Sequence, residues 1–220
     1  MDHNVIYNLT TWLIPLLLCV IIHEVAHGWV AMKLGDYTAK AMGRLTLNPK
    51  DHIDPIGSLL VPGILLLTHS PVLFGWAKPV PVDYRNLRRP KRDMGLVAAA
   101  GPISNILLAM VFALMIHVVD LLPQSQTKIW AIQNLINGIQ LSLVLAIFNL
   151  LPILPLDGGR ILSALLPLKY SIKYQKTEEY GFYILIGLLV IGPLIGLDII
   201  HWFVNTLYPM FVKAFIGIFI

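Results

Sequence analysis

The chain has little charge and almost no cysteine, and both shortages narrow what it can be. Only 13% of its 220 residues are charged, whereas soluble domains contain about 25%. Hydrophobic residues make up 57% of the chain, and the mean hydropathy is +0.75. These values exclude an ordinary soluble domain. The single cysteine, Cys19, excludes an internal disulfide bond, and its apolar surroundings disfavour a thiolate nucleophile. We expect Cys19 to serve in packing.

The sequence also lacks long polar runs, low-complexity linkers and internal repeats. Several apolar runs approach or exceed the ~20 residues that a helix needs to cross a bilayer. The formal net charge of +4 comes from basic residues that gather between these runs, at residues 78–92 and at three later lysines, 169, 173 and 176. Such residues mark cytoplasmic loops rather than a nucleic-acid site. We predict a multi-pass protein of the cell (plasma) membrane, with its basic loops cytoplasmic, the lipid bilayer as its surroundings and no nucleic-acid partner.

The order of the apolar runs predicts an all-α polytopic membrane protein with about five to six apolar helical segments. The expected helices cover residues 11–34, 94–122, 129–149, 182–197 and 199–220. We treat residues 1–220 as one membrane-embedded domain, with a core at about residues 11–168 and C-terminal helices at about residues 181–220.

Two stretches between the first and second long helices are expected to depart from simple spanning helices. Residues 56–75 are apolar but contain Pro62, Gly63 and Pro71, so this run either spans the membrane or re-enters it. If the loops on both sides are cytoplasmic, it is re-entrant. Residues 43–47 lean toward β-structure between turn signals and predict a small β-hairpin.

The run Ile22-His-Glu-Val-Ala-His-Gly28 places two histidines and a carboxylate inside an apolar helix. Residues four apart share one face of a helix, so His23 and His27 can offer two imidazole nitrogens to one zinc ion. Glu24 can then reach a water molecule beside the metal. Because ionisable residues at membrane depth are costly, this run indicates a functional site.

A catalytic zinc usually has three protein ligands and one open position, so the two histidines need a third partner. Asp157 is the candidate, because it follows a segment interrupted by Pro152 and Pro155 and precedes Gly158-Gly159. A helix broken by prolines inside a membrane is expected where the backbone lines a cavity or meets another chain.

With these residues in view, the chain resembles the site-2 protease family of intramembrane zinc metalloproteases, peptidase family M50. The resemblance rests on three ordered motifs: His23 to His27, Gly101-Pro-Ile-Ser-Asn105, and Asn149 to Gly159. It implies a three-helix catalytic core with one Zn²⁺ on His23, His27 and Asp157, and with Glu24 as the catalytic base. No run is long and polar enough for a PDZ or CBS domain, so the chain resembles a minimal member.

Asn105 and Asn149 are candidates for binding the substrate backbone or a developing oxyanion. Asparagines in membranes also commonly hold helices together by hydrogen bonds, and this alternative stays open for both.

The leading functional hypothesis is an intramembrane endopeptidase that cuts transmembrane segments of other membrane proteins, as in regulated intramembrane proteolysis. A membrane metal transporter is an alternative, because histidines and aspartates also line ion pathways. A catalytically silent scaffold is another. Glu24 favours the hydrolase, since a transporter does not need a carboxylate between the two histidines.

Overall fold

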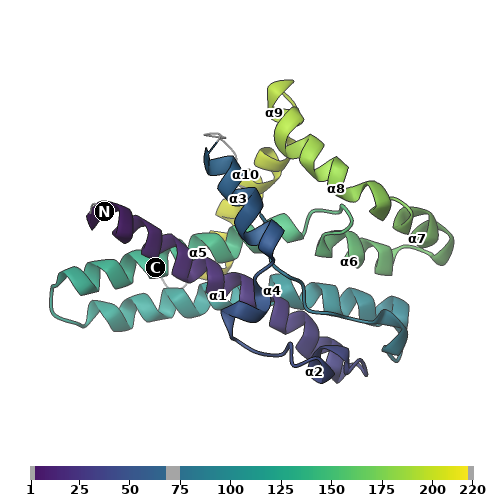
Figure 1. Ribbon diagram of the computed structural model, residues 1–220, viewed down its shortest axis with the longest axis horizontal. Helices are drawn as coiled ribbons and strands as arrows, with labels where there is room; N and C mark the ends of the chain where they lie inside the picture. The colour runs from purple at the N-terminus through teal and green to yellow at the C-terminus, as the bar shows by residue number, and fades with distance from the viewer. Residues whose placement is uncertain (1–2, 68–74, 218–220) are drawn as a thin grey trace.

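The computed structural model describes residues 3–67 and 75–217, and all regular structure within them is helical (Figure 1). The three longest helices are α1 (His3–Lys33), α4 (Pro90–Asp120) and α5 (Gln126–Asn149). Between α1 and α4 lie five short elements: α2 (Thr38–Ala41), η1 (Pro49–His52), η2 (Pro55–Leu60), α3 (Val61–Leu67) and η3 (Tyr84–Asn86). After α5 come α6 (Asp157–Leu165), α7 (Leu168–Gln175), α8 (Glu178–Ile186), η4 (Gly187–Ile191), α9 (Gly192–Leu194), α10 (Ile199–Phe211) and η5 (Val212–Ile216).

The centre of the molecule is the packing of α1, α4 and α5 on one another, with α6 packed on α4. In Figure 1 these three long helices lie side by side, and the N-terminus lies at the same end as the turn between α4 and α5. Cys19 is fully buried in the shared apolar core, as expected for a packing residue. The core also contains Ala109, Phe112, Ala113, Leu135, Ile139, Leu143 and Ile216.

Helix α1 contains Pro15, and its neighbour α5 compensates for it. A proline has no N–H to donate to the carbonyl four residues earlier, which is that of Thr11. The side chain of Asn137 on α5 donates to this carbonyl instead, at 2.9 Å. Because Asn137 and Pro15 are both buried, this bond satisfies a carbonyl that water cannot reach.

Four helical segments of the described chain are long and apolar enough to cross a membrane: Ile6–Lys33, Pro90–Asp120, Gln126–Asn149 and Ile199–Ile216. A fifth is possible if Leu168–Gln175 and Glu178–Leu194, which meet at a bend of 57°, form one span. The polytopic helical fold is therefore as predicted, with four or five such segments in the described residues against the five to six expected. Of the run 56–75, residues 68–74 lie outside the described residues, so the choice between spanning and re-entry stays a prediction.

The predicted β-hairpin at residues 43–47 is wrong, since the described residues contain no strand. The backbone there bonds to other groups instead of a second strand. The N–H of Arg44 donates back to Ala39 at the end of α2. The carbonyl of Thr46 accepts from the Nε2 of His52 at 2.8 Å. These two backbone groups are therefore not available for a strand ladder.

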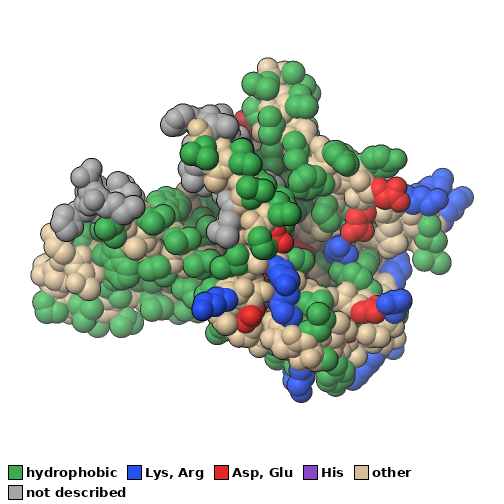
Figure 2. Space-filling view, in the orientation of Figure 1, with side chains coloured by type: hydrophobic (Ala, Val, Ile, Leu, Met, Phe, Trp, Pro, Cys, Tyr) green, Lys and Arg blue, Asp and Glu red, His purple; other side chains and the backbone are tan. Residues whose placement is uncertain are grey.

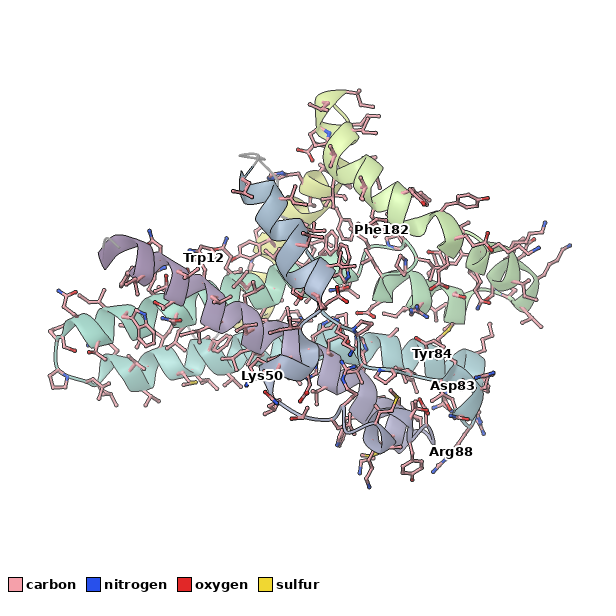
Figure 3. The ribbon with its side chains drawn as sticks, in the orientation of Figure 1. Trp12, Lys50, Asp83, Tyr84, Arg88 and Phe182 are labelled. Carbon is pink, nitrogen blue, oxygen red and sulfur yellow. The ribbon has the colours of Figure 1, made fainter. Side chains whose placement is uncertain are left out.

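The charges gather at one end of the molecule (Figure 2). Lys and Arg side chains surround the end that carries α2 and the start of α4, whereas the visible surface near the α4–α5 turn is mainly hydrophobic. In Figure 3, Asp83, Tyr84 and Arg88 lie at the charged end and Trp12 lies on the opposite half of α1. This asymmetry is the one expected of a membrane protein with its basic loops on one side.

Candidate metal centre

His23 and His27 lie one turn apart on α1 and turn their rings toward α4. Their Nε2 atoms are 3.1 Å apart. Gly101 of α4 packs directly against both rings, because a Cβ atom at this position would lie 2.5 Å from His23 Cε1 and 2.5 Å from His27 Nε2. Glycine is therefore what allows α4 to approach the two histidines so closely.

Asp157 comes to the same place from the other half of the chain. It is the first residue of α6, and the segment with Pro152 and Pro155 separates it from the end of α5 at Asn149. Its Oδ2 lies 3.2 Å from His23 Nε2, and its Oδ1 lies 3.4 Å from His27 Nε2. The broken helix thus turns a carboxylate back toward α1, at the end of α6 where backbone N–H groups favour negative charge.

The two glycines after Asp157 allow α6 to approach the proline segment closely. A Cβ atom at Gly158 would collide with the backbone of Leu150 and Leu151, and one at Gly159 with that of Ile153 and Leu154. The glycines hold α6 against the proline segment, which fixes the direction of Asp157.

The three side chains fit a tetrahedral zinc ion. Ligand atoms bound ~2.0–2.2 Å from such an ion lie about 3.3–3.6 Å from one another. The two Nε2 atoms lie 3.1 Å apart, and each faces a different oxygen of Asp157, at 3.2 Å for His23 and at 3.4 Å for His27. One ligand atom from each of the three residues lies within 4.8 Å of the others. The Oδ2 atom of Asp157 is buried and has no hydrogen-bond donor in the described residues. His23, His27 and Asp157 form the one group of three or more metal-ligating side chains found in the described part of the chain.

Each histidine is also held at its second ring nitrogen, and both contacts come from α4. The Nδ1 of His27 donates to the backbone carbonyl of Val97 at 2.7 Å. The Nδ1 of His23 lies 3.1 Å from the side-chain Nδ2 of Asn105, which is fully buried. Asn105 thus lies on the side of His23 away from Asp157. The predicted contact of Asn105 with substrate or an oxyanion stays a prediction.

Glu24 points to a different side of α1 from the two histidines. Its Oε2 accepts the backbone N–H of Val80 at 2.8 Å. Val80 is buried, and its side chain lies where a Cβ at Gly28, one turn after Glu24, would stand. The other carboxylate oxygen has no hydrogen-bond partner among the described residues, so one oxygen is held and one is available.

The segment around Val80 is anchored at the charged end of the molecule by Asp36, just beyond α1. The buried Asp36 carboxylate accepts from Thr38, from the side chain of Asn86 at 3.1 Å and from the N–H of Asp83 at 2.8 Å. Burial raises the pKa of the Asp36 carboxyl, but these bonds outweigh it and lower the pKa below its ordinary value of 3.8. Hydrogen bonds from Arg85 lower the pKa of Asp83 to about 2. Asp36 is therefore ionised at neutral pH and ties the segment to the end of α1.

Asn149 is not joined to the cluster by any hydrogen bond in the described residues. Its amide donates to the carbonyl of Leu145 one turn back on its own helix, at 3.0 Å. Its predicted role in binding substrate stays a prediction. His52, which could be mistaken for a fourth ligand, is instead buried and bonded to Thr46.

Sequence patterns miss the roles of Val97 and Val80, because both act through the backbone. A carbonyl or an N–H has no residue type that would identify it. One signal was available for Val80: it stands between Pro79 and Pro81, which have no N–H to donate. The N–H of Val80 is thus the one backbone donor in the run Pro79-Val80-Pro81, and it is the group that bonds to Glu24.

Comparisons with known proteins agree with this geometry. A family model described as "Peptidase family M50" matches residues 115–192. Several relatives carry the name "Putative zinc metalloprotease". YwhC of Bacillus subtilis is 38% identical over 100% of this chain and 98% of its own. Rip2 of Mycobacterium tuberculosis is 28% identical over 91% of this chain and 71% of its own.

A further relative, "Zinc metalloprotease MJ0392" of Methanocaldococcus jannaschii, is 27% identical over 84% of this chain and 42% of its own. No solved structure matches the chain.

Proposed function

Because the chain belongs to peptidase family M50 and is a zinc metalloprotease, we propose that it is an intramembrane endopeptidase that hydrolyses peptide bonds in or near transmembrane segments of other membrane proteins. The observation that carries the proposal is the position of the cluster. His23 and His27 belong to the apolar segment Ile6–Lys33. At ~1.5 Å per residue, His23 lies about 15 Å along the helix from Lys33, which is about half the hydrocarbon thickness.

One Zn²⁺ per chain would be held by His23, His27 and Asp157. When bound, zinc supplies a water whose pKa is lowered toward ~7 and polarises the carbonyl of the scissile bond. The contribution of the protein is a ligand set with one carboxylate and two neutral imidazoles, in a setting where water access is restricted. The small exposure of the three side chains, 6%, 12% and 12%, supports this.

Glu24 is the catalytic base of the proposed reaction. Its Oε2 is fixed by the N–H of Val80, so its other oxygen can take the proton of the attacking water and return it to the leaving amine. A carboxylate whose orientation is fixed by the backbone does not need to rotate between the two proton transfers.

The substrate must be partly unwound before it can react. In a transmembrane helix every carbonyl is hydrogen-bonded within the helix, and an exposed polar backbone in the bilayer costs several kcal/mol. The described structure has backbone without regular secondary structure at residues 77–82, where the N–H of Val80 bonds to Glu24. Such backbone can pair with an unwound substrate.

We place the protein in the plasma membrane with its basic loops in the cytoplasm. The charged end shown in Figure 2 supports this orientation.

Cleavage of a labelled single-span membrane protein by the purified chain in detergent tests the proposal, with bound zinc measured in parallel. We expect the wild type to contain about one zinc and to cut the substrate. Glu24→Gln should keep its zinc but lose ~10²–10⁴-fold in kcat, because it removes the base and not a ligand. Chelation should abolish cleavage.

The matched control is Glu179→Gln, which neutralises an exposed glutamate in the first turn of α8. It should leave both zinc content and cleavage unchanged. A zinc-loaded Glu24→Gln variant that cuts as fast as wild type would show that Glu24 is not the base. Zinc binding and transport without cleavage would favour the transporter.

A further inference from the structure

The two histidines face α4 in a strict register. Val97, Gly101 and Asn105 are four residues apart and share one face of α4, and His23 and His27 are four residues apart on α1. His27 contacts Val97, both histidines contact Gly101, and His23 contacts Asn105. The helices therefore run antiparallel here, and each ring meets one polar group of α4 at its Nδ1 atom.

The contact of His27 determines where its proton lies. The Nδ1 of His27 lies 2.7 Å from the carbonyl oxygen of Val97. A backbone carbonyl can only accept a hydrogen bond, so this Nδ1 must carry the ring hydrogen. The Nε2 of the neutral ring then has a free lone pair. This is the tautomer that a metal ligand requires.

His23 needs the same tautomer, because its Nε2 also faces Asp157 and His27. In the arrangement seen here, the Nδ2 of Asn105 lies at the Nδ1 of His23. An amide N–H₂ donates, so this arrangement would leave the ring proton on Nε2, where it blocks a metal. The Oδ1 of Asn105 is meanwhile buried with no partner in the described residues. Rotation of the amide by 180° exchanges these two atoms and requires no other movement.

We propose that Asn105 is a positioning residue whose Oδ1 accepts the Nδ1–H of His23 and so presents the Nε2 of His23 to zinc. The proposal rests on the zinc centre of the proposed function and goes further by assigning Asn105 a role in orienting one ligand. Asn105 and the carbonyl of Val97 then each accept the Nδ1–H of one histidine and leave its Nε2 free to bind the metal. A side-chain acceptor is used for His23 and a backbone acceptor for His27.

Asn137, another buried asparagine, has the alternative role of holding two helices together. Asn137 on α5 joins two helices by donating to the carbonyl of Thr11, and its own oxygen accepts from Gln133 at 2.9 Å. Within the described part of the chain, no hydrogen bond joins Asn137 to His23, His27 or Asp157. Asn105 differs because the one hydrogen-bond partner of its side chain in the described residues is a histidine of the cluster. Asn137 is therefore the matched control for the effect of removing a buried asparagine.

The test is the zinc dissociation constant of the purified full-length chain, measured by competition with a chromophoric chelator, together with the melting temperature of the zinc-free form. Asn105→Leu and Asn105→Ala remove the acceptor and should weaken zinc binding about 10–100-fold. Asn105→Asp keeps an acceptor and loses the donor, so its affinity should remain within about threefold of wild type. Asn137→Leu should lower the melting temperature without changing the zinc affinity.

Asn105→Asp decides between the two hydrogen-bond directions. If it binds zinc as weakly as Asn105→Leu, the amide acts as a donor or as structural glue, and the proposal is overturned. The proposal also fails if Asn105→Leu or Asn105→Ala binds zinc as tightly as wild type. If both of these variants fail to fold, Asn105→Asp still gives an answer. Absence of zinc binding in the wild type itself would instead overturn the metal centre of the proposed function.

Discussion

The rings of His23 and His27 lie so close to position 101 of α4 that a Cβ atom would not fit there, and the residue at this position is Gly101. The same closeness brings Val97 and Asn105 within hydrogen-bond distance of the two rings. A single residue without a side chain thus sets the distance between the ligand helix and the helix that orients the ligands.

Gly101→Ala should therefore weaken zinc binding by about tenfold or more, because the added methyl group displaces at least one ring from its position. The measurement is zinc content and affinity of the purified variant. Gly187→Ala is the control, since a Cβ at Gly187 meets nothing within 4 Å. Equal zinc affinity in wild type and Gly101→Ala would mean that the helices can separate without cost to the site.

At the scale of elements, α1 is a long helix that contains a proline yet remains a continuous helix. The missing N–H of Pro15 leaves the carbonyl of Thr11 without its helical partner, and Asn137 of α5 supplies a donor. The packing of α5 on α1 and the continuity of α1 are therefore coupled. A substitution that removes this hydrogen bond from either helix should therefore destabilise the packing of the two helices.

A double-mutant cycle tests this coupling. Asn137→Leu leaves a buried carbonyl unpaired and should destabilise the protein by about 1–3 kcal/mol. In a Pro15→Ala background the alanine N–H can donate to Thr11, so the same substitution should cost less than half as much. Unfolding free energies in mixed micelles give both values. Equal costs in the two backgrounds would contradict the assignment of Asn137 as the replacement donor.

At the scale of the whole molecule, the fold separates a charged end from an apolar end. Lys50 is an exposed residue of η1, in the part of the chain between α1 and α4, whereas Gln124 lies in the turn between α4 and α5. The positive-inside rule assigns the first to the cytoplasm and the second to the outside.

Single cysteines introduced at these two exposed positions, in a Cys19→Ser background, can test the orientation. Gln124→Cys should react with a membrane-impermeant thiol reagent in intact cells. Lys50→Cys should react only after the membrane is opened. The reverse pattern would place the basic loops outside and the centre within reach of the other face of the membrane.

The sequence by itself determined the helical membrane fold, the pair of histidines with Glu24, and Asp157 as the third ligand-type residue. These follow from local rules. Residues four apart share a helix face, a proline removes one hydrogen-bond donor from a helix, and a polar group in an apolar run needs a partner. Such rules hold within one segment of chain and need no knowledge of its neighbours.

Only the tertiary structure decided which groups stand behind that cluster. The register of α1 against α4 depends on side chains some 75 positions apart in sequence, and it brings the side chain of Asn105 to the Nδ1 of His23. Val97 and Val80 act through the backbone, which every residue shares. The predicted hairpin at residues 43–47 failed for the same reason. A strand requires a partner backbone, and here the N–H of Arg44 bonds to Ala39 of α2 and the carbonyl of Thr46 bonds to His52.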